Sequence, residues 1–375
     1  MNDMADTPPG PRVAFVTGIT GQTGSYLAEL LLANDYEVHG LVRRTSRHSM
    51  GHIKHLEHHP AVRLHYGDVT DLSSLLRIMA AIKTRLEATT CEALEVYNLA
   101  AQSHVHVSFK SPLYTAETTA LGTLNVLEAI RQSGLARVAR VVHASTSELF
   151  GASPPPQNEA TPFHPRSPYA VSKLFAYWTV RNYREAYGMF ACNSVAFNHE
   201  SERRGEHFVT RKITLGVARI AAASAAGQPL VPVKLGNLDA GRDWAHASDV
   251  VDAMWRMAQA DVADDYVVAT GELHTVREFA QAAFAHAGMQ IEWRGSGERE
   301  HAVRVDTGDV VVRVDPEMYR PADVDALRGD SAKLRRATGW TPRVTFDDLV
   351  KRMVAHDVNI NTNVSQSCQS CQSCQ

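Results

Sequence analysis

The chain has 375 residues, of which 44% are hydrophobic and 21% charged, as in ordinary globular proteins and unlike disordered chains. Its formal net charge of -3 leaves no basic excess for nucleic-acid binding. No apolar run reaches the roughly 18 residues of a membrane span, and the start, MNDMADTPPGPR, resembles neither a secretory signal nor a transit peptide. We therefore expect a cytoplasmic protein that binds neither nucleic acid nor membranes.

Short apolar runs alternate with helical patterns along the first 200 residues, which predicts a parallel sheet. The predicted strands are residues 12–17, 37–43, 62–68, 95–101, 140–147 and 191–197. A helix is predicted after Asp71, a candidate N-cap, and a long one at about 115–133. Because such crossovers are right-handed, the expected fold is α/β, a doubly wound parallel sheet of the Rossmann type.

The pattern becomes less regular after about residue 200, which indicates a smaller C-terminal α/β domain for the substrate. In such sheets, ligands bind beyond the carboxyl ends of the strands. The predicted parts are a disordered N-terminus at 1–11, a dinucleotide-binding Rossmann domain at 12–200 with contributions from later segments, a mainly substrate-binding domain at 201–358, and a low-complexity tail at 359–375.

Two groups of residues have the spacing of metal ligands, but neither is predicted to be a metal site. The tail carries Cys368, Cys371 and Cys374 in a polar repeat without a core. A second run is rich in histidine, namely at His48, His52, His55, His58 and His59. We interpret it as a solvated helix face, because no cysteine or carboxylate cluster joins it. Trp244 and Trp255 lie in apolar helical patterns and are predicted core residues.

Three glycines follow the first predicted strand, at Gly18, Gly21 and Gly24. Glycine permits a tight turn and a close backbone approach to a pyrophosphate, which the helix N-terminus then binds. The second strand ends in Arg43 and Arg44, where a carboxylate would select NAD and an arginine suits the 2′-phosphate of NADP. The alternative is a pair of solvated arginines. Asp68, after the third strand, is placed to accept a hydrogen bond from an adenine amino group.

Tyr169 and Lys173 are spaced for one face of a helix. A tyrosine is a poor base at neutral pH, but a lysine cation and an oxidised nicotinamide beside it would lower its pKa. The pair can then accept a hydroxyl proton while hydride leaves, as in short-chain dehydrogenases. Upstream, strand alternation puts Thr146 and Glu148 on one side. The added carboxylate suggests elimination chemistry beyond redox; the alternative for Glu148 is a surface loop position.

Longer motifs occur in a consistent order over roughly residues 12 to 355: GITGQTGSYLAE, NLAAQSHV, ASTSELFG, SPYAVSKLFAYW, FNHESERRGEHFVTRKI, KLGNLDAGRDWAHASDVVDAMW and VVRVDPEMYRPADVDALRGD. In these the chain resembles the GDP-mannose 4,6-dehydratase family, within the extended short-chain dehydrogenase/reductase superfamily. The fifth and sixth motifs are far more specific than the superfamily motifs.

The resemblance implies roles for individual residues. Catalysis would fall to Thr146, Glu148, Tyr169 and Lys173. The implied NADP-binding residues are Gly18, Gly21, Gln22, Thr23, Gly24, Arg43, Asp68, Val69, Leu99, Ala100, Ala101, Gln102, Ser103, Tyr114, Lys173, His199 and Arg204. The implied contacts to a GDP-sugar are Asn198, Lys212, Arg242, Arg320 and Asp323. No metal is implied.

The reaction implied by the resemblance is an internal redox dehydration with a tightly bound, recycled NADP. Tyr169 takes the C4 hydroxyl proton while hydride leaves C4; Glu148 then removes the C5 proton, and water leaves C6 with help from Glu148 or Thr146. Hydride returns to C6, which gives GDP-4-keto-6-deoxymannose. A homodimer or homotetramer is expected, also by resemblance.

Several residues depart from the family's usual pattern. Thr23 stands where aspartate is usual, Phe150 where tyrosine is, Glu202 where proline is, and Asp323 where glutamate is. The loop RRTSRHSMGHIKHL also differs, and in the family this loop reaches the cofactor of a neighbouring subunit. None of these changes touches the implied catalytic residues.

The departures leave alternatives open. The same dehydration on another GDP-sugar, such as GDP-manno-heptose, is the nearest, and added reductase activity on the keto product is related to it. A protein of another class, a non-catalytic NADP-binding sensor, is disfavoured because a sensor has no need of Glu148.

Overall fold

The structure is a computed structural model, which describes residues 12–46, 49–89, 91, 93–319 and 324–372, with side chains to residue 360. The predicted N-terminal segment and most of the tail's side chains lie outside this range. Of the helices in the described residues, none is both long and apolar enough to cross a membrane.

A seven-stranded sheet forms one half of the protein, and all its neighbouring strands are parallel. In spatial order its strands are β11 (Asp265–Val268), β6 (Phe190–Ala196), β5 (Ala139–Ala144), β4 (Leu94–Asn98), β1 (Arg12–Thr17), β2 (Tyr36–Val42) and β3 (Val62–Tyr66). The order reverses between β1 and β4, and in such sheets ligands bind at this point, beyond the carboxyl ends of the strands. The predicted doubly wound Rossmann sheet is confirmed.

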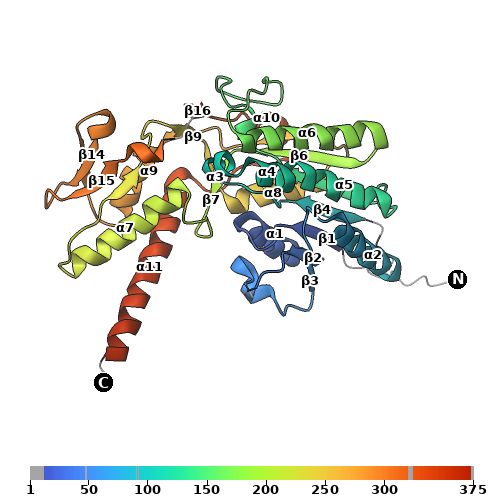
Figure 1. Ribbon diagram of the computed structural model, residues 1–375, viewed down its shortest axis with the longest axis horizontal. Helices are drawn as coiled ribbons and strands as arrows, with labels where there is room; N and C mark the ends of the chain where they lie inside the picture. The colour runs from blue at the N-terminus through green and yellow to red at the C-terminus, as the bar shows by residue number, and fades with distance from the viewer. Residues whose placement is uncertain (1–11, 47–48, 90, 92, 320–323, 373–375) are drawn as a thin grey trace.

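Helices cover both faces of this sheet and form separate apolar cores with it (Figure 1). On one face are α1 (Gln22–Ala33) and α8 (Ala247–Gln259), which pack together. On the other are α2 (Leu72–Thr89), α5 (Gly122–Gln132) and α6 (Pro168–Tyr187). The strands are therefore buried on both sides, which is why they appear in the sequence as short, nearly continuous apolar runs.

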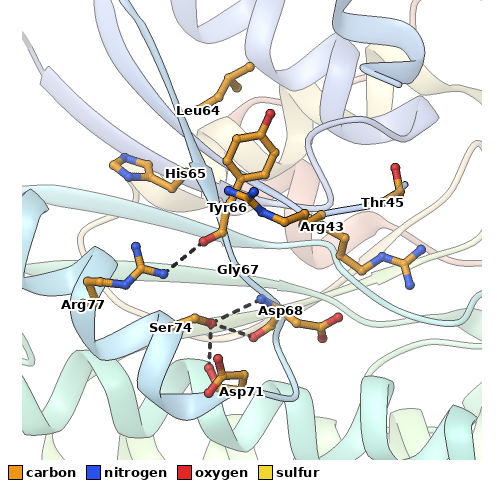
Figure 2. Close-up of a pocket in the computed structure, with 11 residues that line it drawn as sticks. Arg43, Thr45, Leu64, His65, Tyr66, Gly67, Asp68, Asp71, Ser74 and Arg77 are labelled. Atoms are coloured by element: carbon orange, nitrogen blue, oxygen red, sulfur yellow. Dashed lines mark hydrogen bonds between the residues drawn. The ribbon is translucent and has the colours of Figure 1, made fainter. Parts of the chain in front are cut away.

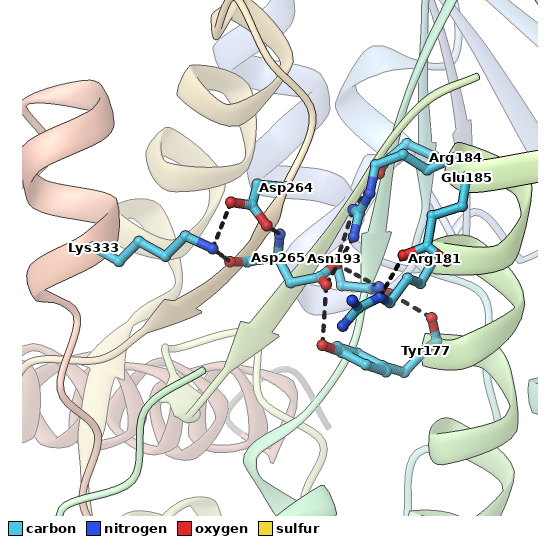
Figure 3. A network of polar contacts seen from close by, with 9 residues as sticks. Tyr177, Arg181, Arg184, Glu185, Asn193, Asp264, Asp265 and Lys333 are labelled. Carbon is cyan, nitrogen blue, oxygen red and sulfur yellow. Dashed lines mark hydrogen bonds and ion pairs between the residues drawn. The ribbon is translucent and has the colours of Figure 1, made fainter. Parts of the chain in front are cut away.

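The edge strand β11 was not predicted, and a polar network holds it in place (Figure 3). The Asp265 carboxylate accepts hydrogen bonds from Tyr177, Arg184 and Asn193 at 2.8 to 3.0 Å. Lys333, on α10 (Ala332–Thr338), pairs with Asp264 at 2.6 Å. Arg184 holds the pKa of Asp265 below its usual value although burial opposes this. The network joins α6 and α10 to the sheet edge.

The second half lies at the other end of the protein (Figure 1). Three helices, α7 (Val209–Ala225), α9 (Val276–His286) and α11 (Phe346–Gln372), share an apolar core with a four-stranded sheet. That sheet consists of β8 (Val233–Leu235), β13 (Ile291–Arg294), β14 (His301–Arg304) and β15 (Val310–Val314).

Two small sheets lie where the halves meet. One pairs β7 (Asn198–Glu200) with β10 (Trp244–His246), and the other contains β12 (His274–Thr275), β9 (Gly241–Arg242) and β16 (Ala326–Leu327). The remaining elements are α3 (Val105–Lys110), α4 (Pro112–Ala116), a π-helical turn at Glu117–Leu121, and 3-10 turns at Gly51–Leu56, Ser147–Leu149, Gly297–Arg299 and Pro316–Met318.

Some local predictions are corrected. The helix expected at about 115–133 is two helices joined by the π-helical turn. Trp244 is buried, as predicted, but on β10 rather than on a helix. Trp255 is only partly buried, and its indole donates to Tyr36 at 3.2 Å. In the histidine-rich run, the four described histidines are exposed, as predicted; His48 lies outside the described residues.

Candidate active site

The glycine turn between β1 and α1 depends on the absence of side chains. Gly18 has φ +69°, and a Cβ on Gly24 would lie 2.3 Å from the Gly18 carbonyl oxygen. A Cβ on Gly21 would meet that oxygen only at 3.4 Å, so the space beside Gly21 is open on its other sides. Within the described residues no side chain caps α1 at Gly21. The first turn of the helix is therefore suited to an anion such as a pyrophosphate.

Thr17 links this turn to the loop after β4. Its hydroxyl accepts hydrogen bonds from the amides of Leu99 and Ala100, each at 3.0 Å, and donates to Asn98 Oδ1 at 2.8 Å. The half-buried residues 99–101 thus lie against the glycine turn, where the dinucleotide is predicted to bind. The Gln102 side chain instead accepts from the His104 amide of its own loop at 2.7 Å and donates to Thr115 of α4 at 3.1 Å. Ser103 beside it is exposed.

A hollow of about 740 Å³ opens at the ends of β2 and β3 (Figure 2). It is lined by the residues that follow β2, by β3 and the loop after it, and by α2, namely Arg43, Arg44, Thr45, Leu64, His65, Tyr66, Gly67, Asp68, Asp71, Ser74 and Arg77. Arg43 donates to the Tyr114 hydroxyl at 2.9 Å, and the Arg44 guanidinium lies 4.6 Å from the centre of the Tyr66 ring. The structure thus brings Arg43 and Asp68 together, as the predicted adenosine end requires.

Sequence reasoning missed several residues of this hollow, among them Tyr66 and Arg77. Arg77 donates to the Tyr66 carbonyl at 3.2 Å from α2, eleven residues further along the chain. An aromatic residue next to Gly67, at the end of the third strand, was the available signal. Val69 is buried and lies against Gly122 and Asn125, away from the hollow, so its cofactor contact stays a prediction.

The start of α1 is hydrogen-bonded to residues 199–201, although the two segments lie about 177 positions apart. Gln22 donates to the His199 carbonyl at 3.0 Å and accepts from Ser201 at 2.8 Å; Thr23 contacts the His199 ring at 2.9 Å. The Gln22 side chain is thus occupied, which leaves its backbone for the predicted cofactor contact. Burial lowers the pKa of His199 to about 4, helped by the charge of Arg204. His199 is therefore neutral at pH 7.

Arg204 and Asn198 lie in the same region. The Arg204 guanidinium pairs with Glu200 at 3.1 Å and lies 3.6 Å from the centre of the Phe208 ring. Asn198 begins β7, in register with Trp244 of β10. Both residues stand where the dinucleotide-binding sheet meets the second half of the protein.

The four predicted catalytic residues, Thr146, Glu148, Tyr169 and Lys173, are all buried. Ser167 caps α6 by accepting from the Ala170 amide at 3.1 Å, and Pro168 begins the helix, so Tyr169 falls in its first turn. After β5, the Thr146 hydroxyl accepts from the Glu148 amide at 3.2 Å. The Thr146 hydroxyl also acts on the Tyr169 phenol, whose pKa it lowers. The end of β5 and the start of α6 thus form one cluster.

Burial controls the ionisation of this cluster. It raises the pKa of Tyr169 to about 12; the Thr146 hydroxyl and the charge of Arg204 lower that pKa, while Glu148 raises it further. Burial also lowers the pKa of Lys173 to about 7. The Lys173 ammonium donates to the Ala144 carbonyl rather than to the phenol. Before any ligand binds, Tyr169 is therefore a protonated phenol, and a further positive charge is needed to make it a base.

Two of the predicted substrate residues, Lys212 and Arg242, contact the residues that flank positions 320–323. Lys212 Nζ lies 3.4 Å from Met318 Sδ, and Arg242 donates to the Val324 carbonyl at 2.8 Å. Arg320 and Asp323 themselves lie outside the described residues. No cluster of three or more potential metal ligands occurs in the part of the chain that the structure describes.

The parallel Rossmann sheet, the glycine turn and the buried Tyr-x-x-x-Lys pair define a protein of the dehydrogenase/reductase type that includes sugar-nucleotide epimerases and dehydratases. In agreement with this, the chain superposes on UDP-glucose 4-epimerase of Thermus thermophilus, crystallised with NAD, at a TM-score of 0.71 and 27% identity, covering 92% of this chain and 98% of that one.

Sequence comparison identifies the family. A family model described as GDP-mannose 4,6 dehydratase matches residues 15–353. GDP-mannose 4,6 dehydratase of Drosophila melanogaster is 52% identical over 93% of this chain and 87% of its own length. The human enzyme of that name is 50% identical over 93% and 92%. The chain belongs to the GDP-mannose 4,6-dehydratase family.

Proposed function

We propose that the protein is a GDP-mannose 4,6-dehydratase, which removes water from GDP-mannose to give GDP-4-keto-6-deoxymannose. The observation that carries this proposal is the buried cluster of Thr146, Glu148 and Tyr169, in which the Thr146 hydroxyl and the Glu148 carboxylate both act on the Tyr169 phenol. A dehydrogenase needs only the hydroxyl and the tyrosine, whereas elimination needs a carboxylate beside them. Membership of the family supports GDP-mannose as the sugar nucleotide.

The residues divide the proton transfers among them. Tyr169 Oη takes the proton of the C4 hydroxyl when C4 is oxidised. The resulting ketone acidifies the C5 hydrogen, which the Glu148 carboxylate removes. Glu148 or Thr146 then supplies a proton to the C6 hydroxyl, which leaves as water. The C5=C6 double bond left behind would be reduced at C6 by the hydride taken from C4, and C5 would take up a proton, which gives the 6-deoxy sugar. Since the cluster is buried, bulk water has little access to these transfers.

The residues that would hold a nicotinamide dinucleotide fit that group. The uncapped start of α1 beside Gly21 suits its pyrophosphate, and the hollow beside Arg43 and Asp68 suits its adenosine end. When bound, such a cofactor supplies a reversible hydride acceptor and a positive charge. That charge lowers the pKa of Tyr169 from about 12, which lets the phenol act as a base.

We further infer that the cofactor is NADP. The second strand is followed by Arg43 and Arg44, both on the wall of the hollow, and arginine pairs well with a phosphate. Replacing Arg43→Ala should weaken NADP binding by about tenfold or more and leave NAD binding nearly unchanged. Fluorescence titration of the stripped protein with each dinucleotide measures both effects. Equal losses for the two cofactors would contradict the assignment of Arg43 to the 2′-phosphate.

The experiment that tests the proposed activity uses the purified protein, GDP-mannose and no added reductant. Mass spectrometry of the sugar nucleotide should show the loss of one water with GDP retained. Absence of this loss from protein that carries its dinucleotide would reject GDP-mannose as the substrate. GDP-manno-heptose is then the next sugar nucleotide to test.

A further inference from the structure

We propose that Asp243 is a positioning residue for substrate binding, which holds Arg242 and residues 324–329 in the arrangement that receives the GDP moiety. This assignment rests on the proposed function, since it takes Arg242 as a contact of the GDP-sugar. Asp243 follows β9 directly, and its side chain is 0% exposed.

The Asp243 carboxylate accepts hydrogen bonds from two separate loops. From the loop after β11 it accepts the Thr270 amide at 2.9 Å, the Thr270 hydroxyl at 2.7 Å and the Gly271 amide at 2.8 Å. From the loop after β16 it accepts the Gly329 amide at 3.3 Å. A buried carboxylate is costly unless its oxygens are bonded in this way. One side chain therefore ties the edge of the large sheet to the segment that returns beside β9.

Arg242 and Asp243 hold the two ends of that returning segment. Arg242 donates to the Val324 carbonyl at 2.8 Å, at its start, and Asp243 binds the Gly329 amide at its end. Between these points β16 pairs with β9, with Gly241 opposite Ala326 and Arg242 opposite Leu327. Loosening of the Gly329 end would let β16 shift and move the carbonyl that orients the Arg242 guanidinium.

Close packing restricts movement of the backbone at Gly329. A Cβ on Gly329 would lie 2.3 Å from Ala269 Cβ and 2.7 Å from the Phe197 ring, so the backbone at Gly329 passes directly against the carboxyl end of the large sheet. Arginine binds phosphate through a planar fork, and its affinity depends on orientation. The position of Arg242 is therefore set by the Asp243 carboxylate, although that carboxylate need not touch the substrate.

The test compares Asp243→Asn with Asp249→Asn in the holoenzyme. Asp249 is also buried, and its carboxylate accepts hydrogen bonds from two backbone amides, those of Arg343 at 2.9 Å and Val344 at 3.0 Å. It lies on α8, and among the described residues it has no hydrogen bond to the segment beside β9. Both variants should lose thermal stability. Only Asp243→Asn should weaken GDP binding, by about tenfold, because an amide accepts at one oxygen where the carboxylate offers two.

Calorimetry measures the affinity for GDP, and absorbance measures the dinucleotide that each variant retains. Hydrogen exchange reports on the backbone of residues 324–331. Asp243→Asn should raise exchange in that segment and keep the dinucleotide. Thr270→Val removes only the hydroxyl bond, so it should fold even where Asp243→Asn does not and should weaken GDP binding by about two- to threefold.

Each outcome separates the two proposals. Full GDP affinity in Asp243→Asn and Thr270→Val, or an equal loss in Asp249→Asn, would overturn the role of Asp243 alone. A wild-type holoenzyme that binds no GDP would overturn the proposed function, and this assignment with it.

Discussion

In the proposed reaction, the Glu148 carboxylate determines whether the oxidised sugar loses water. Replacing Glu148→Gln keeps the shape of the side chain and removes its capacity to take the C5 proton. We expect the rate of water loss to fall by at least about 100-fold, with dinucleotide content unchanged, because none of the residues around the glycine turn is altered. Mass spectrometry of the product and absorbance of the released dinucleotide measure the two quantities. A variant that dehydrates at the wild-type rate would place the base elsewhere.

Burial of Lys173 lowers the stability of the folded protein, because the charged form of the side chain is disfavoured there. Its pKa is about 7 in the folded chain against 10.5 as the ordinary value, so folding disfavours its charged form. That penalty is complete below pH 7, shrinks as pH rises, and vanishes above about pH 10.5, where both states are neutral. Lys173→Met should therefore stabilise the dinucleotide-free protein, more at pH 6 than at pH 9, while it abolishes activity.

Thermal unfolding of wild type and Lys173→Met at the two pH values checks this sign. A smaller gain at pH 6 than at pH 9 would show that the buried ammonium is not disfavoured. A larger gain at pH 6 would make Lys173 an example of a predicted catalytic group that is kept at the expense of stability.

Among the elements, the glycine turn offers two substitutions that separate folding from binding. Gly24→Ala places a Cβ 2.3 Å from the Gly18 carbonyl oxygen, so the turn must open, and we expect a loss of about 1–3 kcal/mol in stability. Gly21→Ala adds a Cβ whose nearest contact is an ordinary one at 3.4 Å. The backbone at Gly21 has φ -80°, which alanine adopts without strain. The Gly21→Ala variant should fold normally and bind the dinucleotide weakly, because the methyl group fills the space beside the start of α1.

Thermal unfolding and dinucleotide titration of both variants distinguish these effects. Normal dinucleotide affinity in Gly21→Ala would mean that the pyrophosphate does not approach this turn.

The sequence predicts features whose residues lie close together along the chain, and it misses contacts between residues that are far apart in sequence. Six parallel strands and the Tyr169–Lys173 spacing are local patterns, and the structure contains them. The four-residue β11 was missed because it begins with Asp265, and its pairing with β6 joins residues about 70 positions apart. The contact of Thr23 with His199 spans 176 positions, and no local pattern encodes it. The role proposed for Asp243 depends in the same way on two loops that only folding brings together.

The predicted homo-oligomer stays a prediction, and α6 offers a surface for it. Val171, Phe175 and Trp178 are 55%, 45% and 50% exposed, and their spacing puts them on one face of the helix. With Leu124 of α5 and Leu174 they line an apolar hollow. Contiguous apolar surface of this kind commonly marks an interface. We expect a second copy to cover it, because these side chains are on the exposed face of α6, whereas Tyr169 and Lys173 of the same helix are buried.

Replacing Phe175→Glu together with Trp178→Glu should convert the oligomer to a monomer of 41.2 kDa, because a charge buried in an apolar interface is strongly unfavourable. Val231→Glu is the matched control, since Val231 is 79% exposed but outside this face. Light scattering after size-exclusion chromatography gives the masses. A wild-type monomer would contradict the oligomer itself. An unchanged oligomer in the double variant would instead move the interface to another surface. The monomer should keep the buried cluster around Tyr169, so its residual dehydration would tell whether assembly is needed for catalysis or only for stability.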